Sequence, residues 1–230
     1  MAVSTLAIDI GGTGIKAIVL DEHDKAITER ARIETPHPAV PKALLSVIKE
    51  LAAKEGKFDR VSVGFPGVVR RGVCETAPNL HPSWEGFHLE SEIHKLLHKP
   101  VRVLNDAAIQ GYGAIKGKGV ELVVTLGTGV GSSLFLDGML VPNLELGHHP
   151  FRNGETYEEQ LCNATLKKIG KKRWNKRLAK AIGYWEPLFN PDHLYLGGGN
   201  SRLVNLTLPP NLTTISNEEG LLGGLALWRH

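Results

Sequence analysis

The sequence predicts an α/β protein with two lobes around a cleft, each built in the order strand, strand, strand, helix, strand, helix. Short segments rich in β-branched residues alternate with longer segments whose apolar residues recur at helical spacing. This order occurs twice, and each copy opens with two strands joined by a glycine-rich turn. Such lobes bury their sheets under helices and leave a groove for ligands. We place the lobes at residues 1–106 and 107–230, with the last helix a candidate to pack back on the first lobe.

The first lobe opens with strands at Thr5–Ile10 and Gly14–Asp21, because β-branched residues flank the glycine turn on both sides. A third strand is expected at about residues 26–33. Pro41 suits the first turn of a helix, and apolar residues between 44 and 51 form a stripe along it. The remaining elements are a strand at Arg60–Phe65, a helix near Leu89–Leu97, a strand at Val101–Leu104 and a helix at Ala107–Ile115.

The second lobe repeats this beginning. Strands at Glu121–Leu126 and Ser132–Leu136 flank the second glycine turn, and Met139–Pro142 offers a third. Helices are expected from about Tyr157 to Phe189. The final elements are a strand at His193–Leu196, which runs into three glycines, and a helix at Leu221–Trp228.

Composition is ordinary for a globular protein: 42% of the 230 residues are hydrophobic and 22% are charged. No apolar run is long enough to cross a bilayer, and the N-terminal residues lack the features of a signal peptide. We therefore expect a cytoplasmic protein without a membrane partner. Cys74 and Cys162 lie in separate segments, so neither a zinc site nor a disulfide framework is expected.

The first candidate site is the glycine turn between Asp9 and Lys16. Its spacing differs from a Walker A loop, and a strand rather than a helix follows it. Backbone N–H groups of such a turn, with the Thr13 hydroxyl, can bind phosphate oxygens, and Asp9 can hold a hydrated Mg²⁺. The alternative is a tight hairpin with a solvated aspartate.

A second turn, Gly127-Thr128-Gly129, again places glycines and hydroxyls between two strands. One such turn is weak evidence for ligand binding. Two of them, each opening one half of the chain, indicate a pair of phosphate-binding hairpins.

Asn105-Asp106 follows a strand at its C-terminal end, where ligands collect in open α/β sheets. A hydroxyl becomes a good nucleophile when a nearby group accepts its proton, and the Asp106 carboxylate is suited to that task. Asn105 can orient a sugar by donating and accepting hydrogen bonds. The alternative is that Asp106 only caps the helix that follows.

Polar side chains suited to sugar hydroxyls cluster at Glu145-Leu146-Gly147-His148, with Glu155, Glu158 and Glu159 downstream. A metal site at His148-His149 is poorly supported, because no regularly spaced third ligand accompanies the pair.

Basic residues dominate the segment from Lys167 to Lys180, which contains no acidic residue. On one helix, Lys168, Lys172, Lys176 and Lys180 would form a row opposite the apolar side chains. A solvated basic face is the default interpretation, and a polyanion ligand is the alternative. Nucleic acid also suits this charge, but the sequence contains no recognisable nucleic-acid-binding module.

Together these segments resemble the ROK family of sugar kinases, within the actin-like, ribonuclease-H-like ATPase superfamily, and most closely its polyphosphate-using glucokinases. The resemblance covers nearly the whole chain. Beyond the two turns and Asn105-Asp106, it rests on residues 65–69, 83–86, 140–148 and 188–192, the last running into Gly197-Gly198-Gly199.

The resemblance implies a homodimeric polyphosphate–glucose phosphotransferase of the duplicated actin-like fold, with Mg²⁺ as cofactor and glucose and polyphosphate or ATP as substrates. It makes Asp106 the general base. The implied sugar-binding residues are Asn105, Glu145, His148, Gly67 and Glu159, with Glu158 as the fallback. The implied phosphate-binding residues are Gly11, Gly12, Thr13, Gly14, Lys16, Gly127, Thr128 and Gly129. Asp9 would serve Mg²⁺, and the glycines at 197–199 would floor a nucleotide pocket if ATP is used.

For a polyphosphate donor, the candidate track is Lys167, Lys168, Lys171, Lys172 and Arg173. The Cys-rich zinc motif that many ROK proteins carry is absent from the sequence. Three alternatives remain: an ATP-dependent glucokinase, mannokinase or N-acetylhexosamine kinase of the same family; a sugar-sensing regulator; and a non-catalytic scaffold. A regulator needs a helix-turn-helix, for which the strand starting near residue 5 leaves no room before it.

Overall fold

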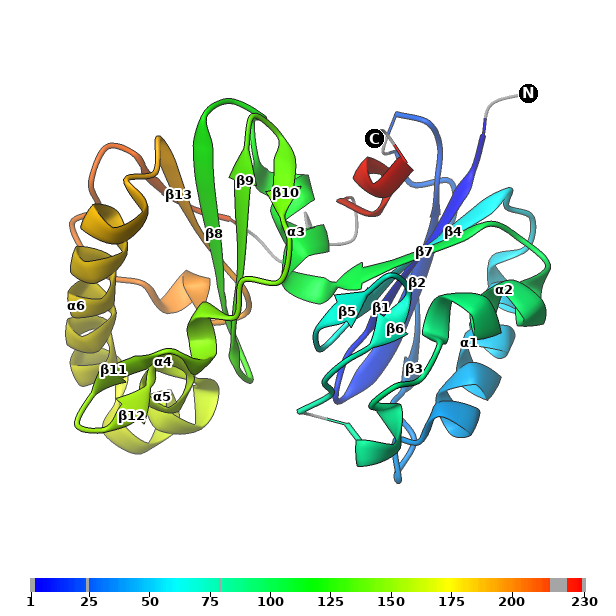
Figure 1. Cartoon of the computed structure of the whole chain (residues 1–230), viewed down its shortest axis with the longest axis horizontal. Coiled ribbons are helices and arrows are strands. Elements are labelled where there is room, and N and C mark those ends of the chain that lie inside the picture. Colours follow the sequence, from blue (N-terminus) through cyan, green and yellow to red (C-terminus); the bar gives the residue numbers. More distant parts are fainter. Residues whose placement is uncertain (1–2, 24, 79, 216–222, 229–230) are drawn as a thin grey trace. The chain divides into compact units, whose positions relative to one another are not determined.

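The chain folds into two compact units, one comprising Met1–Gly113 with Gly220–His230 and the other Ala114–Glu219. The computed structural model describes residues 3–23, 25–78, 80–215 and 223–228. Each unit contains a five-stranded sheet (Figure 1).

The sheet of the first unit has the order β3-β2-β1-β4-β7. The strands β1, β2 and β3 are antiparallel neighbours, whereas β4 and β7 run parallel to β1. Their bounds are Thr5–Ile10, Gly14–Leu20, Ala31–Glu34, Arg60–Phe65 and Val101–Asn105. The helices of this unit are α1 (Pro41–Glu55), α2 (Leu89–Leu97) and α3 (Asp106–Ala114). Between β4 and α2 lie three short elements: the strands β5 (Val69–Arg70) and β6 (Val73–Cys74), and the 3₁₀ helix η1 (Pro82–Trp84).

Successive side chains of β1 point to opposite faces of the sheet and pack in two different clusters. Leu6, Ile8 and Ile10 belong to the large core that also contains the buried faces of α1 and α2. Ala7 lies on the opposite face, where it packs with Leu225 of the 3₁₀ segment η4, Gly223–Trp228. The sheet is therefore covered on both faces.

The C-terminal segment is anchored to the first unit by polar and ring contacts. The Ser62 hydroxyl donates to the Gly224 carbonyl at 2.6 Å, and the Trp228 indole donates to Ser62 Oγ at 2.9 Å. The guanidinium carbons of Arg60 and Arg102 lie 4.9 and 4.7 Å from the Trp228 ring centroid. The expected final helix, Leu221–Trp228, starts outside the described residues, and its described part is a 3₁₀ segment packed on the first unit.

The second sheet has the order β10-β9-β8-β13-β14. Its strands are β8 (Val120–Leu126), β9 (Val130–Leu136), β10 (Met139–Val141), β13 (His193–Gly197) and β14 (Leu212–Thr214). Three antiparallel strands are again followed by two parallel ones, in the same spatial order as in the first unit. The topology confirms the duplication that the element order predicts.

Three helices follow the first three strands of the second unit: α4 (Tyr157–Leu161), α5 (Asn163–Ile169) and α6 (Lys171–Phe189). Between β10 and α4 lie η2 (Leu146–His148), β11 (Pro150–Arg152) and β12 (Glu155–Thr156), and η3 (Ser201–Leu203) follows β13. The apolar face of α6, including Trp174, Leu178 and Trp185, is buried in the second core. The Trp174 indole donates to the Leu161 carbonyl at 2.8 Å, which joins α6 to α4.

Three details differ from the sequence prediction. The third strand covers Ala31–Glu34 only: Ala26 forms just an isolated bridge with Leu20, and the Val19 N–H is accepted by the Thr28 hydroxyl rather than by a backbone carbonyl of a longer strand. The helical region at 157–189 is interrupted at Cys162, with ψ 165°, and at Gly170, with φ +77°. The strand β14 was not predicted.

The boundary between the units also differs from the expected position after residue 106. Ala107, Ala108 and Ile109 are buried, and α3 groups with the first unit up to Gly113. The helix lies against β4, where Gly64 leaves room for the Ile109 side chain. Among the described residues, no helix has both the length and the apolar character needed to cross a membrane.

Candidate active site

One face of the first sheet carries a row of charged residues across three strands. Asp9 on β1 pairs in register with Lys16 on β2, and Lys16 pairs with Arg32 on β3. Directly paired residues point to the same face of a sheet. Lys16 Nζ lies 3.0 Å from Asp9 Oδ2, with exposed side-chain fractions of 36% and 25%. This row of charged residues therefore lies at the end of the sheet that is next to the first glycine hairpin.

The next strand brings the N-terminus of α3 to this face. Gly64 on β4 pairs with Asp9, and a Cβ atom at Gly64 would lie 3.6 Å from Asp106 Cα. Asp106 thus begins its helix one strand away from Asp9, on the same face as the charged row. In the first unit, the structure brings together the candidate base and the first candidate phosphate site.

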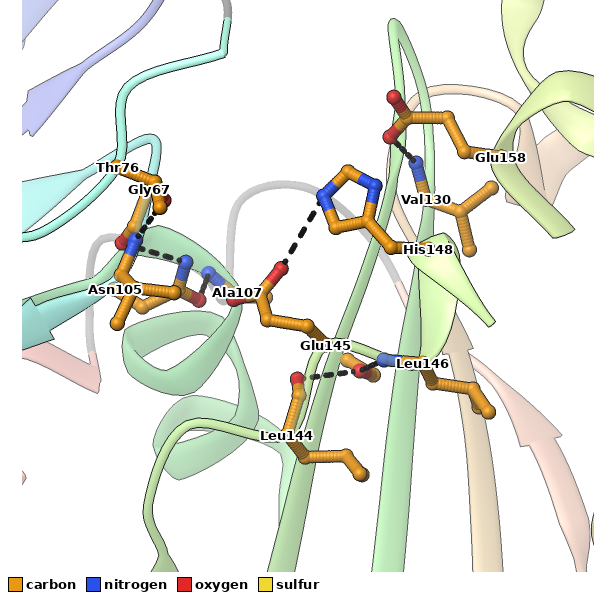
Figure 2. Close-up of polar contacts among 12 residues, drawn as sticks. Gly67, Thr76, Asn105, Ala107, Val130, Leu144, Glu145, Leu146, His148 and Glu158 are labelled. Atoms are coloured by element: carbon orange, nitrogen blue, oxygen red, sulfur yellow. Dashed lines mark hydrogen bonds and ion pairs between the residues drawn. The ribbon is translucent and has the colours of Figure 1, made fainter. Parts of the chain in front are cut away.

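Asn105 caps α3. Its side-chain oxygen accepts the N–H groups of Ala107 at 2.9 Å and Ala108 at 3.2 Å, the arrangement of an N-cap (Figure 2). The Asp106 carboxylate also accepts the Ala107 N–H, at 2.7 Å. Asn105 therefore supplies the N-cap of α3, while Asp106 adds a contact to the same first turn, and the role of its carboxylate as base stays a prediction.

Asn105 also fixes the loop at Gly67, because its amide nitrogen donates to the Gly67 carbonyl at 3.1 Å (Figure 2). Gly67 is buried, and a Cβ atom there would lie 2.1 Å from the Thr76 carbonyl oxygen. Any side chain at position 67 would push these two backbone segments apart. The loop after β4 is thereby held against the start of α3.

The first hairpin closes through the Gly11 N–H, which donates to the Gly14 carbonyl at 3.1 Å. Gly12 and Thr13 at its tip are exposed. The Arg32 guanidinium, which the sequence analysis did not single out, donates to the Thr13 carbonyl at 3.0 Å. The tip therefore presents both backbone and cationic groups to solvent.

In the second hairpin the Gly127 N–H donates to the Gly129 carbonyl at 3.0 Å, a bond across two residues rather than the three spanned in the first hairpin. The Asn163 N–H, at the start of α5, donates to the Gly127 carbonyl at 2.8 Å. Thr128 is exposed at the tip. Both hairpins therefore join the first two strands of their unit by a glycine turn, but the closing hydrogen bond differs by one residue.

Glu145 and His148 are positioned by strand β9. The Ser132 hydroxyl donates to the Leu144 carbonyl at 2.8 Å and accepts the Leu146 N–H at 3.1 Å. Gly147 packs so closely that a Cβ atom would lie 2.1 Å from the Val130 carbonyl oxygen. This contact explains why glycine stands between the two polar residues.

The two side chains face each other, with Glu145 Oε2 3.6 Å from His148 Nε2 (Figure 2). Loss of hydration raises the pKa of the Glu145 carboxyl above its ordinary value; His148 opposes that shift, and the nearby Glu158 carboxylate adds to it. Glu145, His148 and Glu158 therefore form one electrostatic cluster in the second unit.

The two neighbouring glutamates on α4 have different surroundings. The Glu158 carboxylate accepts the Val130 N–H at 2.9 Å, and it fills the space where a Cβ of Gly129 would lie (Figure 2). The Glu159 carboxylate instead accepts the N–H and hydroxyl of Thr156, completing a capping box and lowering its own pKa. The Glu159 carboxylate is thus engaged in the cap of α4, whereas that of Glu158 lies against the second hairpin; the choice between them as a sugar ligand stays a prediction.

The three glycines at the end of β13, Gly197, Gly198 and Gly199, have different surroundings. Gly198 has φ +82°, and a Cβ atom there would lie 2.4 Å from the Leu126 carbonyl oxygen. Gly197 is buried beside Ile215, and Gly199 is exposed. Gly198 is thus required for packing against the strand that leads into the second hairpin.

The basic residues lie on two helices, because Gly170 separates α5 from α6. All five residues of the candidate track are exposed, and none forms an ion pair with a described acidic side chain. The members are Lys167, Lys168, Lys171, Lys172 and Arg173. Since Lys168 lies on α5 while Lys172, Lys176 and Lys180 lie on α6, the single-helix row was a wrong prediction. Within the described chain no group of three potential metal ligands occurs.

The sequence model of the ROK family matches residues 5–164. The chain belongs to the ROK family. A polyphosphate glucokinase of Mycobacterium tuberculosis is 34% identical over 212 residues, which cover 88% of this chain and 80% of that protein. An N-acetylmannosamine kinase of Haemophilus influenzae is also 34% identical, over 145 residues that cover 59% of this chain and 47% of that protein.

Among solved structures, the inorganic polyphosphate/ATP-glucomannokinase of Arthrobacter sp. strain KM is similar over 99% of this chain and all of that one. The TM-score is 0.90 and the sequence identity 32%. The ROK chain described here therefore has the duplicated actin-like fold of the family's sugar kinases along its whole length.

Gly147 provides a structural test of this site. We expect Gly147→Ala to lower the free energy of unfolding by about 1–3 kcal/mol, because the added methyl meets a backbone carbonyl that cannot move alone. Gly183→Ala is the matched control, since a methyl there meets nothing within 4 Å in the exposed interior of α6. That control should raise stability by about 0.5–1 kcal/mol. Equal effects in urea unfolding would contradict the assigned packing.

Proposed function

We propose that the protein is a Mg²⁺-dependent hexokinase-type phosphotransferase that converts glucose to glucose 6-phosphate with inorganic polyphosphate as donor. The placement of Asp106 carries the proposal: it starts α3 beside Gly64, on the sheet face that bears Asp9 and the first hairpin. The 34% identity to a polyphosphate glucokinase over most of both chains supports the substrate pair.

Asp106 is the proposed general base. A sugar hydroxyl attacks phosphorus effectively only if a group within hydrogen-bond reach accepts its proton. The residue lies at a helix N-terminus, whose dipole stabilises a negative charge there. Asn105 holds the helix start and the Gly67 loop in place, so the base is positioned by a rigid support.

The two hairpins are the proposed donor sites. Gly11, Gly12, Thr13 and Gly14, with Lys16, would hold the phosphoryl chain on the first unit, and Gly127, Thr128 and Gly129 on the second. Mg²⁺ keeps several water molecules and binds substrate phosphates, so one protein carboxylate suffices, and Asp9 with its 25% exposed side chain suits that part. When bound, the ion would offset charge on the transferring phosphoryl group.

Glu145, His148 and Glu158 are the proposed sugar ligands of the second unit. All three gather at the start of β9 through contacts with Val130 and Ser132. Carboxylate and imidazole groups supply the directional hydrogen bonds that a polyhydroxylated ligand needs. Binding the sugar in one orientation aligns a single hydroxyl with the donor.

One surface feature favours polyphosphate over ATP as the principal donor. The exposed cations of α5 and α6 lack acidic partners among the described residues, and such a surface attracts a long polyanion. ATP remains the second donor to test, since the similar Arthrobacter enzyme is a polyphosphate/ATP kinase. The family resemblance further supports a homodimeric, cytoplasmic enzyme of glycolysis.

The proposal is tested by offering polyphosphate and ATP, each with glucose, mannose and N-acetylmannosamine, to the purified protein with Mg²⁺. We expect glucose 6-phosphate formation from polyphosphate. Asp106→Asn should lower kcat at least about a hundredfold while glucose binding persists, because only proton acceptance is lost. Glu29→Gln, an exposed carboxylate-to-amide change, is the control. Retained turnover in the Asp106 variant would refute the assigned base.

The two neighbouring glutamates permit a matched comparison. Glu158→Gln should raise the KM for glucose about tenfold or more, because a charged acceptor is lost while an amide oxygen can still accept the Val130 N–H. Glu159→Gln should leave that KM unchanged, since glutamine also serves in a capping box. Both KM values are measured by a coupled assay. A raised KM in Glu159→Gln with an unchanged KM in Glu158→Gln would identify Glu159 as the sugar ligand instead.

The basic track is tested by charge reversal. Replacing Lys167, Lys168, Lys171 and Lys172 with glutamate should raise the KM for long polyphosphate about tenfold at low ionic strength, and less at high salt. The KM for glucose should not change. The control reverses Lys25, Lys42, Lys49 and Lys57, which are exposed on the first unit and give the same change in net charge. If both sets of substitutions raise the KM for polyphosphate equally, the lysines of α5 and α6 do not form a polyphosphate-binding track.

A further inference from the structure

Arg32 is placed at the first hairpin by strand register. It lies on the edge strand β3, directly opposite Lys16, which lies directly opposite Asp9. The three side chains therefore share one sheet face. Arg32 is exposed, and its Nη2 donates to the Thr13 carbonyl at 3.0 Å. The guanidinium thus lies at the tip that carries the exposed Gly12 and Thr13.

Gly14 provides the space that the guanidinium occupies. A Cβ atom at Gly14 would lie 2.6 Å from both Nε and Nη2 of Arg32 and 2.8 Å from its Cζ. Gly14 is a strand residue and is not among the residues with positive φ. Glycine at this position is therefore explained by the arginine packed on its backbone, rather than by the conformation of the turn.

The charge of Arg32 is not neutralised by the residues around it. The Asp9 carboxylate pairs with Lys16, and no described acidic side chain lies within ion-pair distance of Arg32. Glu34, two residues along β3, is exposed and does not pair with it. A guanidinium has five N–H donors in a fixed fork, and its hydrogen bond to Thr13 uses only part of them.

We propose that Arg32 binds phosphoryl oxygens of the donor at the first hairpin. A planar guanidinium matches phosphate oxygens with two parallel hydrogen bonds, and the contact with Gly14 and Thr13 holds it in position before the donor arrives. The ligand class is an oligophosphate, which polyphosphate and ATP share. The inference rests on the proposed function for its place in catalysis, but the binding itself is measurable without glucose.

Arg32→Gln separates charge from structure, because the amide can still donate to the Thr13 carbonyl. We expect this variant to raise the KM for both donors and the Kd for tripolyphosphate about tenfold, with the KM for glucose unchanged. Arg32→Lys should recover only part of the lost affinity, since a lysine ammonium carries the charge but cannot form the two parallel hydrogen bonds of a guanidinium. Arg30→Gln, an exposed arginine in the preceding turn, is the control and should have no effect.

A double-mutant cycle with Gly14 tests the packing on which the proposal depends. Gly14→Ala should displace the guanidinium and weaken tripolyphosphate binding as much as Arg32→Ala does, and adding Gly14→Ala to Arg32→Ala should weaken it little further. Full additivity would overturn the proposal, because Gly14 would then act independently of Arg32.

Calorimetry with tripolyphosphate, together with urea unfolding, distinguishes the outcomes. Weaker binding in Arg32→Gln at unchanged stability supports the proposal, whether or not glucose is phosphorylated. Unchanged tripolyphosphate affinity overturns it, even if the wild-type protein is an active kinase. Loss of stability with unchanged affinity would assign Arg32 a structural role only and also overturns it.

Discussion

Close approach of backbone to backbone determines where the candidate site residues can lie. At Gly67 the loop after β4 meets the Thr76 carbonyl, at Gly147 the segment η2 meets the Val130 carbonyl, and at Gly198 the end of β13 meets Leu126. In each case a single methyl group would lie within 2.4 Å of a carbonyl oxygen that belongs to a strand or loop. Because backbone atoms cannot move aside as a flexible side chain can, these positions accept only glycine.

These contacts matter because they position residues beside them in the chain. Gly147 lies between Glu145 and His148, and its fit against β9 places both beside the strand that leaves the second hairpin. The Gly67 carbonyl accepts a hydrogen bond from the side-chain amide of Asn105. This bond links the loop after β4 to the start of α3, where Asp106 lies. The polar groups are thus held by packed backbone as well as by their own hydrogen bonds, which fixes their positions before a ligand arrives.

The sequence predicted the bounds of strands and helices correctly where the pattern of apolar residues and the glycine or proline that ends it were clear. The bounds of β1, β4 and α2 agree with the expected ranges, since β-branched runs end at glycine or proline and the α2 stripe is short and regular. Strand β14 was missed because three residues after two prolines give too little periodicity. The helix break at Gly170 was missed because the positive charge on both sides suggested one continuous face.

Within the site, the sequence identified the segments but not the orientation of adjacent side chains. Glu158 and Glu159 are neighbours, and the sequence contained a signal for the structural part of Glu159 that was not used: Thr156 followed three residues later by Glu159 is the pattern of a capping box. Arg32 offered no such signal. Its position depends on the pairing of β3 with β2, and a shift of one residue would have sent it to the other face.

Charge balance connects these residues to the proposed chemistry. A carboxylate base next to a phosphoryl chain works only if nearby cations and dipoles offset the added negative charge, because like charges favour its protonation. On the first unit, Asp9 and Lys16 neutralise each other, so Arg32 supplies the excess positive charge of that row. The N-terminus of α3 supplies the second contribution, at Asp106 itself. A cation therefore lies at one end of the row and a helix N-terminus at the other, and both would offset the negative charge of the proposed oligophosphate donor.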